Sequence, residues 1–346
     1  MIGTIGGSPN LWLDAPVARR GALVKWTGRV LRYGSTMILC VTLNPCLDKT
    51  LEVDSWNPGD SVRGRSTCAI VGGKGNNVAR ALSRLGRRAR PVTFLGGSVG
   101  EDCHIRLVRD DSFDPIVVPT KAETRVILTV RSNDGSEPTA FFDPDPEIEP
   151  DEAAALVSAV EDELNAGGID AITLSGSSPC EATKGVYADL IALAKSRGTP
   201  IFLDTYGAAL AAVWGFWPDF IQLNLREAAA HLGKASPSDS DLDRLLFGWS
   251  RRGVKIALIT DGPRNVRIVV EGKKLLAIPP KIEPVNPVGA GDCLLAGLVD
   301  ATLAGLDPCS RLRRGIACAT AATLVWDAGA IDPDRVTELE KTIILD

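Results

Sequence analysis

Residues 286–298 join a turn, a glycine run and an acidic side chain at the start of a helical pattern. Asn286-Pro287 favours a turn, because the residue before a proline is pushed out of the helical region. Gly289-Ala290-Gly291 supplies small residues with free backbone N–H groups, and apolar residues at helical spacing follow from Asp292. A helix N-terminus favours an anion, and Asp292 would repel one that stayed there. We therefore interpret Asp292 as a base that takes a proton from an attacking hydroxyl; the alternative is an ordinary N-cap.

Two further clusters precede this stretch in the chain. Asp48 follows the solid apolar strand 38–43, and its carboxylate could accept two sugar hydroxyls or merely form an Asx-turn. The segment Gly72–Asn77 is a glycine-rich turn before a helix, in which Lys74 offers a cation and Asn77 an amide. The glycines of the second cluster would let the backbone approach a ligand closely.

Short β-like runs predict a small sheet that stands off the main one. They cover residues 50–53 and 66–70, and strands 124–130 and 139–142 would complete the sheet. Arg63 projects from this region, and Arg125 would face either a ligand or water.

From Pro150 onward helices and strands alternate, which predicts βαβ units and a parallel sheet. A polar cluster follows each strand and so falls on the same carboxyl edge, where open α/β sheets bind ligands. Two clusters have structural alternatives: Asn224 with Glu227 has the spacing of a capping box, and Asp261-Gly262 is an ordinary hairpin turn. The small-residue helix near 315–325 could be tight packing or a pocket wall. The clusters contain Ser175, Asn224, Glu227, Thr260 and Gly262.

Composition excludes several other classes. The 346 residues are 45% hydrophobic and 23% charged, which is globular, and a net charge of −5 without a basic run argues against nucleic acid and against an acidic membrane surface. No apolar run reaches the ~18–20 residues of a membrane span. The eight cysteines contain no Cys-x-x-Cys pair, and neither of the two histidines sits in a motif. We expect a cytoplasmic enzyme without a structural zinc site.

Residues 1–36 differ from the rest, since they carry scattered basic residues and no continuous apolar segment. We expect a disordered N-terminal extension there and a folded domain over 37–346. Its lid segments are expected at about 48–70 and 115–145.

Taken in order, these motifs resemble the PfkB (ribokinase-like) carbohydrate kinases, in particular their hexose-phosphate branch. The resemblance spans about residues 37–335 and rests on an ordered set of motifs, which are Thr42–Asp48, Gly72–Leu82, Ser175-Gly-Ser, Asp204–Gly207, Asn224-x-x-Glu227, Thr260-Asp-Gly262 and Gly289–Asp292. It implies a three-layer α/β/α fold with a mostly parallel central sheet and a small β-sheet lid.

The resemblance also implies roles, carried over position by position. Asp292 is the expected base, with Gly289, Ala290 and Gly291 as the anion hole. Substrate contacts are expected from Asp48, Gly72, Gly73, Lys74, Asn77, Arg63, Arg125 and Ser175, where the arginines would hold a phosphate that the substrate already carries. ATP contacts are expected from Asn224, Glu227, Thr260 and Gly262, with Glu227 acting on Mg²⁺ indirectly, through Mg-ATP and water. A homodimer through the lid is the expected assembly.

The expected reaction is ATP-dependent phosphorylation of a hydroxyl of a phosphorylated ketohexose, with fructose 1-phosphate as the first acceptor. Tagatose 6-phosphate, fructose 6-phosphate, an unphosphorylated sugar and a non-catalytic sugar-phosphate sensor stay open. Three departures from the family's pattern bear on this choice: Ala140, Phe142 and Asp145 in the lid, Tyr206 in place of a serine, and Cys293 after Asp292. The first two put the identity of the sugar in doubt.

Overall fold

The computed structural model describes residues 37–213 and 215–346, which lie in one compact unit. The expectation of a disordered extension over residues 1–36 concerns residues outside this description. The start of the domain at Met37 therefore stays a prediction.

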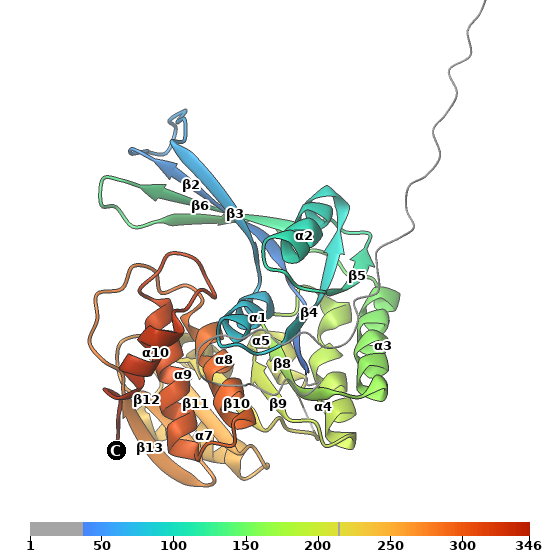
Figure 1. Ribbon diagram of the computed structural model, residues 1–346, viewed down its shortest axis with the longest axis vertical. Coiled ribbons are helices and arrows are strands. Elements are labelled where there is room, and N and C mark those ends of the chain that lie inside the picture. Colours follow the sequence, from blue (N-terminus) through green and yellow to red (C-terminus); the bar gives the residue numbers. More distant parts are fainter. Residues whose placement is uncertain (1–36, 214) are drawn as a thin grey trace, which may run out of the picture. The chain divides into compact units, whose positions relative to one another are not determined.

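A large sheet forms the centre of the fold (Figure 1). Neighbours from β11 through β5 are parallel, and β12, β13 and β14 continue the sheet antiparallel at one edge. In spatial order the strands are β14 (Ile344–Leu345), β13 (Lys273–Ile278), β12 (Val266–Val270), β11 (Ile256–Thr260), β10 (Phe220–Asn224), β9 (Ile201–Asp204), β8 (Ile169–Ser175), β1 (Met37–Thr42), β4 (Ala89–Gly96) and β5 (Ile116–Thr120). The predicted mostly parallel sheet is confirmed.

Helices cover both faces of this sheet and make the three predicted layers. Successive residues of β1 show why: Ile38 and Cys40 belong to one buried apolar cluster, whereas Leu39 and Val41 belong to the other. The first cluster includes residues of α1 (Lys74–Arg84), α2 (Gly97–Arg109), α8 (Ala290–Leu303), α9 (Pro308–Ala322) and α10 (Pro333–Glu340). The second includes residues of α3 (Pro150–Ala166), α4 (Val186–Ser196), α5 (Gly207–Ala211), α6 (Leu225–Leu232) and α7 (Asp239–Ser250).

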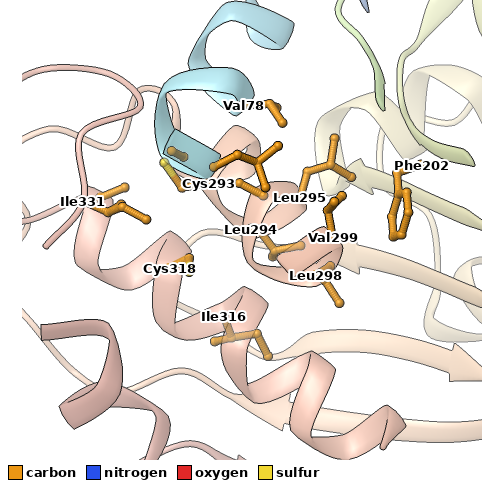
Figure 2. Packing of buried hydrophobic residues seen from close by; sticks show 14 of the residues in the cluster. Val78, Phe202, Cys293, Leu294, Leu295, Leu298, Val299, Ile316, Cys318 and Ile331 are labelled. Atoms are coloured by element: carbon orange, nitrogen blue, oxygen red, sulfur yellow. The ribbon is translucent and has the colours of Figure 1, made fainter. Parts of the chain in front are cut away.

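Helices α8 and α9 pack closely within the first cluster (Figure 2). A Cβ at Gly297 of α8 would lie 2.8 Å from the Arg314 carbonyl oxygen, and one at Gly315 of α9 would lie 2.8 Å from Leu298 Cγ. Leu294, Leu298 and Ile316 fill the space around this crossing. The small residues near 315–325 are thus used for tight helix packing, which anchors the α8 N-terminus.

A second, four-stranded sheet forms the lid, which projects from the carboxyl edge of the large sheet in Figure 1. Its order is β3 (Ser66–Gly72), β2 (Cys46–Val53), β6 (Arg125–Ser132) and β7 (Thr139–Phe142), with β2 and β6 parallel. The lid segment predicted to begin near residue 115 begins instead at β6. Residues 116–120 are β5, which pairs with β4 in the large sheet.

Two boundaries near the site differ from the sequence-based expectation. Asp48 lies inside β2 rather than in a turn after β1, because β2 already begins at Cys46. Helix α1 begins at Lys74, within the segment predicted as a turn, so Lys74 and Asn77 both lie in its first turns. Both shifts place ligand-type side chains on regular elements, which hold them more rigidly than a loop.

Candidate active site

The start of α8 places an acidic side chain in a buried position. Gly289 is the N-cap with φ 83°, a left-handed conformation that favours glycine, and its Cβ would lie 3.1 Å from that of Ala328. Asp292 follows in the first turn and is only 4% exposed. Its Oδ2 accepts a hydrogen bond from the Asn77 amide at 2.8 Å. The helix N-terminus, the carboxylate and Asn77 of α1 are therefore brought together.

The pKa of Asp292 is raised to about 7. Burial is the main cause, because it penalises the ionised carboxylate, and the nearby carboxylate of Asp204 acts in the same direction. The Lys74 ammonium and the Asn77 hydrogen bond partly oppose this rise. A carboxylate with a pKa near neutrality is well matched to general-base catalysis.

Lys74 lies among acidic side chains that come from different parts of the chain. Its Nζ donates to Asp204 Oδ1 at 2.9 Å and to Glu227 Oε1 at 3.3 Å. Burial would lower the pKa of Lys74, but the carboxylates of Asp204, Glu227 and Asp292 raise it overall, so the ammonium stays charged. The Tyr206 ring lies 5.4 Å from the same Nζ. Lys74 thus provides a fixed positive charge near Asp292.

Asp204 and Gln222 complete this network, and the sequence analysis did not assign them a role. The Gln222 amide donates to Asp204 Oδ2 and to the Gly291 carbonyl oxygen, both at 2.8 Å. Asp204 is 2% exposed. One of its carboxylate oxygens accepts from Lys74, and the other accepts from Gln222, which connects Asp204 to the glycine turn. A polar Gln222 within the apolar run of β10 was a signal that could have been found in the sequence.

The carboxyl ends of β8 to β11 gather the remaining polar residues as predicted. Ser175 pairs in register with Asp204, and Asn224 with Thr260, so these residues lie side by side along the edge. Asn224 caps α6 in a capping box: Asn224 Oδ1 accepts from the Glu227 N–H at 2.8 Å, and Glu227 Oε2 accepts from the Asn224 N–H at 2.9 Å. Because Glu227 Oε1 contacts Lys74, the box serves the site as well as the helix. Gly262, in the turn after β11, is exposed with φ 57°.

A cavity of about 260 Å³ lies between the lid and two loops of the main body. Asp48 and Thr50 of β2 line it from the lid, and Asn286 and Trp326 line it from the loops. Burial raises the pKa of Asp48, and Arg80 opposes this rise. Asp48 therefore faces a partly open space large enough for part of a sugar.

The other predicted substrate contacts are distributed as follows. Arg125 begins β6 at the root of the lid, whereas Arg63 is exposed in the loop between β2 and β3. Gly72 and Gly73 allow close packing, since a Cβ there would lie 2.6 Å from Cys46 Sγ and 2.7 Å from Thr42 Cγ2, respectively. Ser175 is fully buried, and its carbonyl oxygen accepts from the Tyr187 hydroxyl at 2.8 Å. Arg63 is therefore a predicted substrate contact that the structure does not place near Asp292.

The donor chemistry of the edge fits a magnesium nucleotide. Asp204, Glu227 and Asp292 oppose the single ammonium of Lys74, so the site carries excess negative charge that a divalent cation would balance. Within residues 37–213 and 215–346, no three His, Cys, Asp or Glu side chains form a ready-made metal cluster. In the same part of the chain, none of the helices has the length and apolar character of a membrane span.

Comparison with known proteins finds relatives that match most of the chain. The chain is 29% identical over 306 residues to 1-phosphofructokinase of Rhodobacter capsulatus, covering 88% of this chain and 96% of that protein. A possible 1-phosphofructokinase from Thermotoga maritima has the same fold, with a TM-score of 0.80, 24% identity and coverage of 90% of this chain and 99% of that one. So does the tetrameric inhibited form of phosphofructokinase-2 from Escherichia coli, with a TM-score of 0.79, 24% identity and coverage of 89% and 98%.

The match to a family model settles the assignment. The model of the pfkB family carbohydrate kinases matches residues 30–335, which is most of the chain. Together with the buried Asp292 behind its glycine turn, this match shows that the chain belongs to the PfkB family of carbohydrate kinases.

Proposed function

We propose that the protein transfers the γ-phosphoryl group of ATP to a hydroxyl of a phosphorylated ketohexose, with fructose 1-phosphate as substrate and fructose 1,6-bisphosphate as product. One observation carries the reaction type. Asp292 lies buried at the N-terminus of α8, directly after the glycine turn and hydrogen-bonded to Asn77.

The chemistry follows from this placement. The acceptor hydroxyl gives its proton to Asp292 while its oxygen forms a bond to the γ-phosphorus, and the bond to the bridging oxygen of ADP breaks. The N–H groups of Gly291 and Asp292 in the first turn of α8 have no partner within the helix, so they can stabilise charge on the transferring group. The N–H of Ala290 instead donates to the Pro287 carbonyl oxygen at 3.3 Å. Lys74 adds a positive charge beside the same centre.

We assign the nucleotide to the carboxyl edge of β10 and β11, where Asn224, Glu227, Thr260 and Gly262 lie. Glu227 would act on Mg²⁺ indirectly, through water and the phosphates, because Oε2 already accepts from the Asn224 N–H and Oε1 from Lys74. When bound, Mg²⁺ neutralises charge on the phosphates. The acidic excess around Lys74 supports this assignment.

The identity of the acceptor rests on a cation and on the relatives. Arg125 lies at the root of the lid, on the same face as Asp48, since Cys46 and Asp48 of β2 pair with Arg125 and Ile127 of β6. A guanidinium there suits a phosphate that the acceptor already carries. The R. capsulatus relative is named 1-phosphofructokinase. Tagatose 6-phosphate and fructose 6-phosphate fit the same chemistry.

A second candidate is a kinase for an unphosphorylated sugar, and one observation favours it. Arg125 Nη1 donates to Asp145 Oδ1 at 2.8 Å, so its charge is already balanced by this chain.

An ADP-release assay with Mg-ATP tests both candidates, with the three sugar phosphates and plain fructose offered separately. Turnover of one sugar phosphate, lost in Asp292→Asn, supports the proposal. Turnover of plain fructose alone refutes the phosphorylated acceptor. A thermal shift with sugar phosphates but no turnover would point to a sensor instead.

We further propose a homodimer through the lid and a cytoplasmic location. Phe141 of β7 is 50% exposed on the lid and packs edge-on against Trp56, with ring centroids 6.1 Å apart. An apolar group of this kind suits a protein contact. All eight cysteines fall within the described residues and are free thiols, as expected in a reducing compartment.

A further inference from the structure

A cluster of polar side chains at the root of the lid surrounds Arg125. Its Nη1 donates to Asp145 Oδ1 at 2.8 Å, and its Nη2 donates to the Asn44 carbonyl oxygen at 3.3 Å. The Asn44 amide donates to Asp145 Oδ1 at 2.8 Å and to Ser177 Oγ at 3.2 Å. A single oxygen of Asp145 therefore accepts from two donors that converge on one point.

The cluster is incomplete without a further ligand. Among the described residues, Arg125 Nε and Asn44 Oδ1 are buried and have no hydrogen-bond partner. Asn44 is 4% exposed and the Arg125 side chain 14%, whereas the Asp145 side chain is 45% exposed. Buried polar groups are normally paired, so the unpaired donor of Arg125 and the unpaired acceptor of Asn44 could form hydrogen bonds with another molecule. Asp145 is the member that can turn into solvent.

Lys74 near Asp292 and Arg80 near Asp48 have more partners than Arg125 has. Lys74 lies between Asp204 and Glu227. Arg80 pairs with Asp111 through two hydrogen bonds of 2.8 and 2.9 Å and also donates to the carbonyl oxygens of Val71 and Ala328. In the described part of the chain, the one acidic partner of Arg125 is the half-exposed Asp145. An anionic group on a ligand would therefore meet Arg125 and compete with Asp145.

We propose that Asp145 is a specificity-determining residue. Its carboxylate occupies the position on Arg125 that the phosphate of the acceptor would take. A phosphorylated acceptor binds only when Asp145 leaves Arg125, because two anions on one guanidinium repel each other. An unphosphorylated sugar has no such competitor. This inference rests on the proposed function in one respect, namely that the acceptor lies beneath the lid near Asp48.

Asp145→Asn tests the proposal, since the amide keeps the size and the acceptor oxygen but loses the charge. We expect the KM for fructose 1-phosphate to fall by about tenfold, which corresponds to about 1.4 kcal/mol. The kcat, the KM for ATP and any KM for plain fructose should stay within about twofold of the parent values. Glu147→Gln is the matched control, because Glu147 is an exposed acid two residues away. An unchanged or higher KM in Asp145→Asn overturns the proposal.

A double variant shows whether Asp145 acts through Arg125. In an Arg125→Met background the gain from Asp145→Asn should disappear; a gain that persists overturns the proposal, since the two effects must couple. Equal melting temperatures of the parent and Asp145→Asn would show that the change in KM is not a folding effect.

The two proposals can fail separately. If only Asp145→Asn accepts fructose 1-phosphate, the inference is supported and the proposed acceptor is wrong for the parent. If neither protein turns over any sugar, the proposed function fails, and calorimetric binding of fructose 1-phosphate decides the inference. Tighter binding by Asp145→Asn then supports it, and equal binding overturns it.

Discussion

Asp292 combines three demands at one position: burial, proximity to a lysine and a place in the first turn of α8. Burial makes ionisation costly and raises its pKa to about 7, while Lys74 limits that rise. The folded protein therefore holds the proton of Asp292 more tightly than the unfolded chain does. The ionised form of Asp292 therefore lowers the stability of the folded protein, which is the cost of the proposed base near neutral pH.

We predict opposite effects of Asp292→Asn on activity and stability. The kcat should fall by about 10³-fold or more, because the acceptor proton loses its base. Between pH ~4 and ~7 the folded state binds more protons at Asp292 than the unfolded chain does. The free energy of unfolding therefore falls as pH rises through this range, and the loss is complete above pH 7. The variant should therefore be more stable at pH 8 by roughly 4 kcal/mol, because a rise in pKa from 3.8 to about 7 costs about 1.4 kcal/mol per unit and already includes the attraction of Lys74.

Urea unfolding at pH 8 and at pH 4 measures this effect. The stabilisation should be present at pH 8 and small at pH 4, where Asp292 is protonated in the folded protein and only about half protonated in the unfolded chain. A variant less stable than the parent at pH 8 would contradict the assigned cost of burial.

A second residue-scale prediction concerns the pH profile of kcat/KM. In the parent it should rise about tenfold per unit below pH 7 and level off above, as Asp292 loses its proton. Lys74→Met removes the charge that lowers the pKa of Asp292, so its profile should move to higher pH. Asp204→Asn removes a charge that raises that pKa, so its profile should move to lower pH. Profiles that shift in the same direction would rule out this electrostatic account.

At the scale of elements, the carboxyl edge of the sheet could be predicted from the sequence. Apolar strands alternate with helices, and right-handed crossovers bring every post-strand cluster to one edge. That rule predicts one shared edge for these clusters, whereas the strand pairing shows which neighbours result: Asn224 beside Thr260 and Ser175 beside Asp204.

The contacts between distant loops could not be predicted in the same way. Asp145 meets Asn44 across 101 positions, and no periodicity links a loop residue to a partner that far away. Gln222 was missed for a related reason, because a lone polar residue in a buried strand signals a hydrogen bond without naming its partner. The lid boundary was misplaced because β5 has the same β-type composition as the lid strands but pairs with β4.

The lid and the main body are joined by a contact between Arg131 and Trp326. The Arg131 guanidinium lies 4.3 Å from the centre of the Trp326 ring, and Arg131 also pairs with Glu52 on the neighbouring strand at 3.3 Å. The Trp326 carbonyl oxygen in turn accepts from the Asn286 amide at 2.7 Å, which connects the lid to the turn before α8.

We predict that Trp326→Ala weakens lid closure over the acceptor. A cation–π contact at a partly exposed site contributes about 0.5–1 kcal/mol, so the KM for the acceptor should rise about two- to fivefold while the KM for ATP changes little. Trp326→Phe is the control, since it keeps an aromatic face for Arg131. Equal acceptor KM values for parent and Trp326→Ala would show that this contact has no part in closure.

At the scale of the whole molecule, the two faces of the lid carry different residues. Thr129 and Ala140 line the cavity beside Asp48, and alternation along β7 places Phe142 on that same inner side and Phe141 on the outer one. Both phenylalanines are half-exposed or more, at 50% for Phe141 and 63% for Phe142. Adjacent residues thus separate the proposed pairing surface from the acceptor site.

This arrangement gives a direct test of the proposed lid-to-lid dimer. Phe141→Asp should shift the protein from dimer to monomer in light scattering across a concentration series, because a buried unpaired charge opposes association. Phe142→Asp is matched in residue type and exposure, but it should leave the dimer intact and instead raise the KM for the acceptor. If both variants stay dimeric, the contact lies elsewhere on the surface; if the parent is monomeric at every concentration, the lid works without a partner.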